Sequence, residues 1–442
     1  MKQTKHSSIL HPRSLAVLIC ESVIYEGQSL GEAIDDKLEN KDISPQDRGF
    51  IQSLSFGVTR WYWQLNDQLK PLLQKPIKTK ERQVKLILLV GIFQIQHLQT
   101  PAHAAVSDTV KCCQKLNKTW AKNLINACLR NYLRKQDERK QITLPPTHYS
   151  HPEWMIERIA QAWPEQKKLI FAANNQAAPL CLRVNKRYCS PESYLELLQE
   201  HDIEASLDPY SGIGIRVKNS IAIHRLPKFS AGWVSVQDTA SQLIHQFFQI
   251  KNNDRVLDAC AAPGGKTSLL LEHAPEDIVM HAVDIKGKRN NKLVDTLKRL
   301  NLTAKIITGD ASEPTTWWDK EFYQHILVDA PCSGLGVVRR HPDIKHLRQE
   351  NDLIELKQSQ RNILTACWEL LADNGKLLYT TCSILPEENE QQINDFLQKN
   401  PEAKSIHIDH PTAVNLKFGQ QTLPGISDMD GFYYCLLQKV VK

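Results

Sequence analysis

The sequence predicts a multidomain protein with an all-helical N-terminal region, a small α/β unit and a C-terminal open α/β sheet. Three observations favour this class. Residues 1–140 place apolar side chains at helical spacing, and residues 141–235 mix short strands with helices. Residues 236–442 hold five apolar runs, each followed by a polar or sulfur-bearing residue. A chain of 442 residues is long enough for two or three domains, so we expect boundaries near these positions.

The N-terminal region is predicted to be helical because its apolar residues recur every three or four positions. The segments are residues 14–25, 48–65, 84–98 and 121–134, and the third is apolar nearly all round, which predicts a central buried helix. Residues 1–140 carry 22 Lys and Arg against 13 Asp and Glu, so positive charge is concentrated here. This surface either faces nucleic-acid phosphates or is simply solvated. The aromatic cluster of residues 61–63 beside Arg60 either stacks on bases or, as we favour, packs in the core.

A linker and a small mixed unit are predicted next. Residues 140–149 contain Pro145-Pro146 and few apolar side chains, which is typical of a linker. The unit that follows is predicted to contain helices at 152–163, 165–174 and 191–200, and strands at 180–185, 212–217 and 233–236. Three basic residues lie at the end of the first strand: Arg183, Lys186 and Arg187. They either bind phosphate or belong to a solvated strand end.

A glycine turn organises the C-terminal region. Residues 255–266 read R-V-L-D-A-C-A-A-P-G-G-K, an apolar run followed by a Pro-Gly-Gly turn and a segment compatible with a helix. Glycine lets backbone N–H groups approach a ligand closely, and the N-terminus of a helix carries partial positive charge. The turn is therefore predicted to hold a small polar ligand, with an ordinary βα turn as the alternative.

Four further apolar runs continue this pattern, at residues 278–283, 304–308, 325–328 and 376–380. Each is followed by chemistry-bearing residues: Asp284, Gly309-Asp310, Asp329-Ala330-Pro331-Cys332 and Thr381-Cys382-Ser383. Open α/β sheets bind ligands outside the carboxyl ends of their strands, and an acid ending the second strand binds ribose hydroxyls. We therefore expect these residues to share one crevice. An amphipathic helix is also expected at 241–250.

Three motifs in this region together resemble a known family. They are D-A-C-A-A-P-G-G-K-T at 258–267, V-D-A-P-C-S-G-L-G at 328–336 and Y-T-T-C-S-I-L-P-E-E-N-E at 379–390. In this order they resemble the RNA cytosine-C5 methyltransferases that use S-adenosylmethionine, and the whole chain is similar to the 16S ribosomal RNA methyltransferase B subfamily. The resemblance implies a NusB-like helical RNA-binding domain, an RNA-recognition-like α/β unit and a Rossmann-like methyltransferase domain. It also implies methylation of one cytosine in 16S rRNA.

The resemblance assigns roles to two cysteines. C5 of cytosine is a poor nucleophile, so these enzymes first add a thiolate at C6. In the RNA enzymes the T-C-S cysteine, here Cys382, is the nucleophile, and the P-C cysteine, here Cys332, assists resolution of the adduct. DNA cytosine-C5 methyltransferases attack with the P-C cysteine, so the residues alone do not decide. Asp329 is expected to contact the base, and Lys266 to supply a positive field that favours the thiolate.

The resemblance also places the methyl donor along the strand ends. The turn should face the methionine end of S-adenosylmethionine, Asp284 the ribose and Asp310 the adenine side, and Asp329 is expected to line the same pocket. The turn consists of Cys260, Ala261, Ala262, Pro263, Gly264, Gly265 and Lys266.

The composition also indicates the metal content, redox state and cellular compartment expected for this protein. The 11 cysteines include no C-x-x-C pair, so no metal is expected, and we expect them to be reduced. No apolar run reaches 18 residues and the N-terminus lacks a signal-peptide core, so we expect a cytoplasmic protein without a membrane segment. A monomer is the default expectation. The expected partner is 16S rRNA or a small-subunit assembly intermediate. The alternatives are a noncatalytic RNA-binding or antitermination factor, and a C5-methyltransferase acting on another RNA or on DNA.

Three further short segments of the C-terminal region have predicted roles. Arg339 and Arg340 are expected to meet RNA phosphates or the base pocket, with the alternative that Pro342 opens a helix. The acids of residues 387–388 are explained by the dipole of the helix that follows them. Residues 430–432 are expected to close the sheet.

Overall fold

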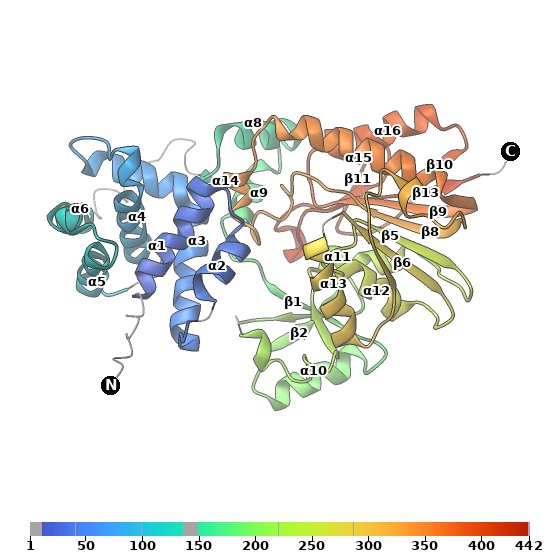
Figure 1. Ribbon diagram of the computed structural model, residues 1–442, viewed down its shortest axis with the longest axis horizontal. Helices are drawn as coiled ribbons and strands as arrows, with labels where there is room; N and C mark the ends of the chain where they lie inside the picture. Colours follow the sequence, from blue (N-terminus) through green and yellow to red (C-terminus); the bar gives the residue numbers. More distant parts are fainter. Residues whose placement is uncertain are drawn as a thin grey trace, which may run out of the picture. The chain divides into compact units, whose positions relative to one another are not determined.

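The computed structural model describes residues 11–39, 41–98, 100–135, 149–219, 221–285 and 287–440 (Figure 1). The chain forms two compact units. We call Met1–Arg158 together with Val338–Glu350 the helical unit, and Ile159–Val337 together with Asn351–Lys442 the sheet unit. The linker predicted at 140–149 lies almost entirely outside the described residues.

The helical unit confirms the four helices predicted for the N-terminal region and adds two. Among its described residues before 136, the α-helices are α1 (Pro12–Glu26), α2 (Leu30–Leu38), α3 (Pro45–Leu69), α4 (Arg82–His97), α5 (Ala102–Lys115) and α6 (Lys122–Arg134). Short 3₁₀ turns occur at Lys70–Leu72, Thr79–Glu81 and Thr119–Ala121. The sequence reasoning missed α2 and α5. In α5 the buried stripe is built largely from small or polar side chains, which weakens the apolar periodicity.

Helix α4 is the centre of the helical unit, as its apolar sequence predicts. Its residues from Leu86 to Val90 are fully buried, and α1, α3, α5 and α6 pack around it. Gly57 of α3 allows one close approach, because a Cβ at this position would lie 1.9 Å from the ring of Phe93. The core is therefore dense on every side of this helix.

The segment Val338–Glu350 belongs to the helical unit although it follows the P-C motif in sequence. Lys345, in the short helix α14 (Ile344–Leu347), is buried and its Nζ donates to the carbonyls of Arg60 and Ser150, both at 3.0 Å. Burial, and then the charge of Arg60, holds the pKa of Lys345 well below its usual value. Arg60 Nη2 donates to the carbonyl of Arg339 at 2.8 Å. Arg339 is only 3% exposed, which argues against the expected contact of this residue with RNA phosphates, while the expected contact with the base pocket stays a prediction.

The aromatic cluster of residues 61–63 packs within the helical unit, as favoured from the sequence. Trp61 stacks on His97 with ring centroids 4.8 Å apart, and Trp63 stacks on His346 at 4.5 Å. Both rings therefore contact side chains of the same unit.

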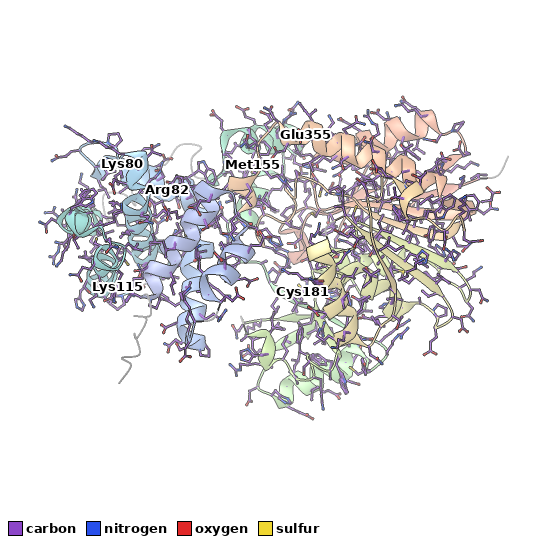
Figure 2. All side chains as sticks on the ribbon, in the orientation of Figure 1. Lys80, Arg82, Lys115, Met155, Cys181 and Glu355 are labelled. Carbon is purple, nitrogen blue, oxygen red and sulfur yellow. The ribbon has the colours of Figure 1, made fainter. Side chains whose placement is uncertain are left out.

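The sheet unit begins with a small antiparallel sheet of strand order β2-β3-β1-β4. Its elements and the helices before it are α8 (Glu153–Ala162), which spans the division between the units, α9 (Lys167–Asn174), β1 (Leu180–Val184), α10 (Pro191–Glu200), β2 (Ala205–Leu207), β3 (Gly214–Val217) and β4 (Val234–Val236). All predicted strands and helices here are confirmed, and β2 was missed. Cys181, labelled in Figure 2, lies on β1 and is buried.

The large sheet has the strand order β11-β12-β13-β9-β8-β5-β6-β7, and β10 pairs with β13. The strands β5 (Arg255–Ala259), β6 (Val279–Asp284), β7 (Lys305–Thr308), β8 (Tyr323–Asp329) and β9 (Leu371–Thr381) run parallel. The strands β10 (Ala403–Ile406), β11 (Val414–Asn415), β12 (Gln420–Gln421) and β13 (Tyr433–Lys439) complete it, and β13 lies antiparallel to β9. The five parallel strands predicted from the sequence are all present.

Helices cover both faces of this sheet (Figure 1). One face packs on α12 (Gly265–His273) and α13 (Gly287–Leu300), and the other on α15 (Asp352–Glu369) and α16 (Glu390–Lys399). Neighbouring strand residues alternate between the faces, so Val256 joins the first core and Leu257 the second.

The helix predicted at 241–250 is shorter than expected. It is α11 (Thr239–Gln242), followed by one 3₁₀ turn at Leu243–Gln246. Asp238 fixes its start by accepting a hydrogen bond from the N–H of Ala240, and the same carboxylate accepts from Asp430 N–H. The helix is buried nearly all round rather than amphipathic.

Candidate active site

The carboxyl ends of the five parallel strands lie at one edge of the large sheet. The strand order reverses between β5 and β8, since β6 and β7 lie on one side of β5 and β8 and β9 on the other. Such a switch point opens a crevice outside the strand ends. The register aligns Asp284 with Thr308, and Asp329 with Thr380. The residues predicted at the five strand ends therefore share this edge.

The glycine turn connects β5 to α12 and contacts the β6–α13 connection. Gly264 has φ +98°, and a Cβ there would lie 2.5 Å from Leu293, so both conformation and space require glycine. Ala262 N–H donates to Asp284 Oδ2 at 3.1 Å, and Ala261 N–H donates to the carbonyl of Val283. These two hydrogen bonds tie the turn to the end of β6, next to the N-terminus of α12.

Asp284 and Asp310 differ in their surroundings. Asp284 is buried, and its Oδ2 lies 3.7 Å from Nη1 of Arg289 as well as accepting from the turn. Asp310 is half-buried, and its Oδ1 accepts from the N–H and hydroxyl of Ser312. Within the described ranges no hydrogen bond joins Asp310 to another predicted site residue. Its backbone neighbour Gly309 donates to the carbonyl of Asp284, which keeps the two strand ends adjacent.

Lys266 and Asp329 form an ion pair across the switch point, with Nζ and Oδ2 2.6 Å apart. Burial lowers the pKa of Lys266, but the Asp329 carboxylate and the nearby Cys382 outweigh it and raise that pKa. The ammonium also lies 5.2 Å from the ring centroid of Phe432, within cation–π range. Lys266 is therefore held as a cation among these groups.

The two predicted cysteines lie side by side, with Sγ atoms 3.3 Å apart. Cys382 is half-buried and Cys332 is buried. The hydrogen bond to Cys382, together with burial, raises the pKa of Cys332 well above its ordinary value. At neutral pH, Cys332 is thus a protonated thiol.

The loops that carry the cysteines are joined through two glycines. Gly336 N–H donates to the carbonyl of Cys382 at 2.9 Å, and Gly431 N–H donates to the carbonyl of Gly336 at 2.8 Å. A Cβ on Gly336 would lie 1.9 Å from Gly431 O, so no larger residue fits. The segment 430–432 thus contacts the P-C loop through Gly431 and Lys266 through Phe432. Its role is therefore wider than the expected closure of the sheet.

Glu388 has a different role from the helix-dipole explanation given for it above. It is fully buried, and its carboxylate accepts from Ser333 N–H at 2.8 Å, from the hydroxyls of Ser333 and Ser383, and from Gln360 Nε2 at 3.0 Å. Ser333 follows Cys332, and Ser383 follows Cys382. One carboxylate therefore fixes both cysteine loops. The sequence signal was available, since this acid follows the T-C-S motif by five residues, but burial was not visible in it.

Replacement of Glu388 should separate loop geometry from overall stability. Glu388→Ala leaves several buried donors unpaired, at about 1–3 kcal/mol each, so we expect a lower unfolding temperature and inactive protein. Glu388→Gln keeps the volume and one acceptor oxygen, so we expect folded protein whose activity falls at least tenfold. Thermal unfolding and methyl transfer, measured on the same preparations, test this.

The matched control is Glu390→Gln, because Glu390 accepts from Phe418 N–H instead of a cysteine loop. It should keep near wild-type activity. Equal losses in Glu388→Gln and Glu390→Gln would contradict a specific role for Glu388.

Asp258 is a second residue that the sequence reasoning did not single out as a site residue. It is fully buried at the end of β5, its Oδ2 accepts from Thr267 at 2.6 Å, and its Oδ1 has no hydrogen-bond partner among the described residues. Burial, reinforced by the charges of Asp329 and Asp284, raises its pKa to about 7. A carboxyl group with a perturbed pKa beside a glycine turn at the strand ends is typical of a functional site.

Family models match all three parts of the chain. Residues 245–438 match the family described as 16S rRNA methyltransferase RsmB/F, residues 10–134 the NusB family, and residues 151–224 the ferredoxin-like domain of RsmF/B-like methyltransferases. The fold and site thus define a methyltransferase with two additional N-terminal domains, and the predicted fold class is confirmed.

The chain is also similar to known methyltransferases over nearly its full length. Ribosomal RNA small subunit methyltransferase B of Klebsiella pneumoniae is 42% identical, over 97% of this chain and 98% of the relative. The protein of that name from Vibrio vulnificus is 40% identical, over 97% and 100%. The chain belongs to the ribosomal RNA small subunit methyltransferase B family.

Solved structures share the fold. The crystal structure of PH0851 superimposes with a TM-score of 0.81 at 22% identity, over 97% of this chain and 99% of that one. NSun6 from Pyrococcus horikoshii with SFG gives 0.59 at 18% identity, over 66% and 99%. Within the described part of the chain, no helix is long and apolar enough to cross a membrane, and no group of His, Cys, Asp and Glu could hold a metal ion.

Proposed function

We propose that the protein transfers a methyl group from S-adenosylmethionine to C5 of a cytosine in 16S rRNA through a covalent adduct with Cys382. The observation that carries the proposal is the pair of sulfur atoms 3.3 Å apart at the end of the parallel sheet, next to the Lys266–Asp329 ion pair. Family membership supports an rRNA substrate, because the relatives are named for it.

The residues at the strand ends fit the methyl donor. Gly264 is the N-cap of α12 and Gly265 its first residue, so this helix N-terminus carries no side chains there and favours a carboxylate. Asp258 Oδ1 offers a buried acceptor without a partner for an ammonium group. Asp284 then takes the ribose and Asp310 the adenine side. Bound S-adenosylmethionine supplies an electrophilic methyl group on a sulfonium sulfur.

The chemistry follows from the thiol pair. The Cys382 thiolate forms a bond to C6 of cytosine, which moves electron density to C5, and C5 takes the methyl group from the sulfonium sulfur, which leaves as S-adenosylhomocysteine. Water then takes the C5 proton, the electron pair of the C5–H bond re-forms the C5–C6 double bond, and the bond from C6 to sulfur breaks, which returns the Cys382 thiolate. Asp329 contacts the base at N3 and N4, while Lys266 keeps a positive charge beside the reacting sulfur.

The surroundings of the sulfurs support Cys382 as nucleophile. Cys382 is half-buried and so can reach a base, whereas Cys332 is buried and its hydrogen bond to Cys382, together with burial, raises its pKa. As a neutral group 3.3 Å from Cys382, Cys332 can exchange a proton during resolution of the adduct.

The decisive experiment is methyl transfer from labelled S-adenosylmethionine to 16S rRNA, followed by mapping of 5-methylcytosine. Naked rRNA and small-subunit assembly intermediates should be compared, because either can be the partner. Transfer to C5 of one cytosine supports the proposal. No transfer to any RNA would favour a noncatalytic RNA-binding factor, and transfer to DNA would favour the DNA enzyme class.

Alkylation across a range of pH should distinguish the two thiols. Because the pKa of Cys332 is raised, its reactive thiolate appears only at pH values above the usual thiol range, so iodoacetamide at pH 7–8 should label Cys382 first. Lys266→Met removes the neighbouring positive charge and should slow labelling of Cys382 several-fold at neutral pH. Mass spectrometry of the modified peptides measures both.

Lys292→Met is the control for this experiment, because Lys292 lies on the exposed face of α13. It should leave labelling unchanged. If Cys332 were labelled before Cys382 in wild-type protein, the roles of the two cysteines would have to be exchanged.

The proposal also covers the domain boundaries, the cellular compartment and the oligomeric state. The basic helical domain, the ferredoxin-like unit and the catalytic domain are proposed to span 1–140, 141–235 and 236–442. The protein is proposed to act as a cytoplasmic monomer.

A further inference from the structure

Arg183 lies at the junction between the small sheet and the glycine turn. Its side chain is fully buried, which excludes both the phosphate-binding and the solvated interpretations. Nε and Nη2 donate to the two carboxylate oxygens of Glu272 at 2.9 and 2.7 Å, and Nη2 also donates to Ser268 Oγ at 3.0 Å. Nη1 donates to Gln237 Oε1 at 2.6 Å and to the carbonyl of Gly265 at 2.7 Å. All three guanidinium nitrogens are therefore engaged.

These contacts fasten β1 to the helix that follows the turn. Glu272 and Ser268 lie on α12, and Gly265 is its first residue. Two neighbours of Arg183 in sequence reach the other end of that helix, where Arg187 Nη2 donates to the carbonyl of Leu271 and Lys186 Nζ to that of His273. Cations suit that end of a helix. The basic cluster of the small unit thus spans α12 from first to last turn.

The hydrogen bond from Arg183 to the Gly265 carbonyl orients the peptide between Gly265 and Lys266. The carbonyl of Gly265 and the N–H of Lys266 belong to one planar trans peptide, so they point in opposite directions. The Gly265 carbonyl accepts from Arg183 Nη1 and also from Gln237 Nε2 and Ser268 Oγ, both at 3.2 Å, and Arg183 donates to each of those two side chains. Arg183 therefore organises the donors that hold this carbonyl, and with it the direction of the Lys266 N–H, one of the helix-start donors that lack an intrahelical partner. It also fixes where the Lys266 side chain leaves the backbone.

We propose that Arg183 is a positioning residue through which the small α/β unit sets the geometry of the methyl-donor turn. The proposal rests on the proposed function, since it takes the turn as the donor site. Arg183 does not touch the donor and acts through Gly265 and α12. The catalytic domain thus needs the small unit to bind its donor tightly, besides any use of that unit in RNA recognition.

The chain offers a matched control in Arg299. This arginine also joins the small unit to a helix of the large sheet, since Nη1 donates to the carbonyls of Phe229 and Val234 and Nη2 to Ser235 Oγ. It lies at the C-terminal end of α13 and makes no hydrogen bond to the turn among the described residues. Loss of Arg299 should weaken docking without moving the turn.

Three variants of the full-length protein test the proposal. Arg183→Lys keeps a charge opposite Glu272, but a compact ammonium cannot satisfy the acceptors that the planar fork reaches together. Arg183→Met with Glu272→Gln removes both buried charges at similar volume, which avoids an unpaired carboxylate. Arg299→Met is the control. Each is measured by calorimetric titration with S-adenosylhomocysteine, by thermal unfolding, and by kcat and KM for S-adenosylmethionine.

We expect Arg183→Lys and the double variant to bind S-adenosylhomocysteine at least tenfold more weakly than wild type, with a matching rise in KM for the donor. Arg299→Met should bind S-adenosylhomocysteine within threefold of wild type, even if its unfolding temperature falls as far as that of the Arg183 variants. Wild-type affinity in Arg183→Lys, or equal loss in the Arg299→Met control, would overturn the positioning role.

Failure of the proposed function gives a different pattern. A wild-type chain that binds S-adenosylhomocysteine but methylates no cytosine would refute the proposed function, while the affinities of the variants would still decide the role of Arg183. If wild-type protein does not bind the probe, both proposals fall.

Discussion

Replacing Cys382 with alanine should abolish methyl transfer while leaving the protein folded. Without the thiolate no bond forms to C6 of the base, so C5 stays unreactive. We expect a loss of roughly 10³-fold or more, the scale seen when a covalent nucleophile is removed. Because Cys382 is half-buried, removal of its sulfur should cost only about 1 kcal/mol of stability. Transfer of labelled methyl groups to 16S rRNA, with circular dichroism and thermal unfolding, measures both effects.

The control for this variant is Cys435→Ala. Cys435 is a buried cysteine on β13, where it packs in the second core of the large sheet. Its loss should lower the unfolding temperature more than Cys382→Ala does, yet leave most of the activity. Substantial methylation by folded Cys382→Ala would refute the proposed nucleophile.

Replacing Cys332 with alanine should instead trap the reaction after the covalent step. Cys382 is retained, so the adduct forms, but the neutral thiol 3.3 Å away that assists resolution is gone. We expect an enzyme–RNA species that survives denaturing gel electrophoresis and contains labelled methyl groups, with turnover reduced at least 100-fold.

The double variant Cys332→Ala with Cys382→Ala is the control, and it should form no such species. Trapping by Cys382→Ala rather than by Cys332→Ala would exchange the roles of the two sulfurs. Normal turnover by Cys332→Ala would remove it from the reaction altogether.

Much of the sheet unit was predictable because its signals are local. A strand followed by Pro-Gly-Gly identifies the turn from neighbouring residues alone, and each parallel strand is an apolar run with a polar end. The predicted runs correspond to β5, β6, β7, β8 and β9, and their polar ends share one edge. The helix at 241–250 was less predictable, since burial on all sides replaced the amphipathic pattern.

Burial of charged residues was not predictable in this way. Arg183 and Glu272 are 89 positions apart, and Ser333 and Glu388 are 55 apart. Each looks like an ordinary solvated charge in its own segment. Arg339 also looked accessible in sequence, but its segment belongs to the helical unit and the residue is buried there.

The sequence by itself determined the order of the domains, the parallel strands and the identity of the residues at their ends. Periodicity and turn chemistry carry this information, because they depend on residues a few positions apart. Only the tertiary structure decided that the two sulfurs lie 3.3 Å apart, that Glu388 fixes both of their loops and that Arg183 fixes the turn. A charge can be buried only where distant parts of the chain supply its hydrogen-bond partners, so its role exists only after the chain has folded.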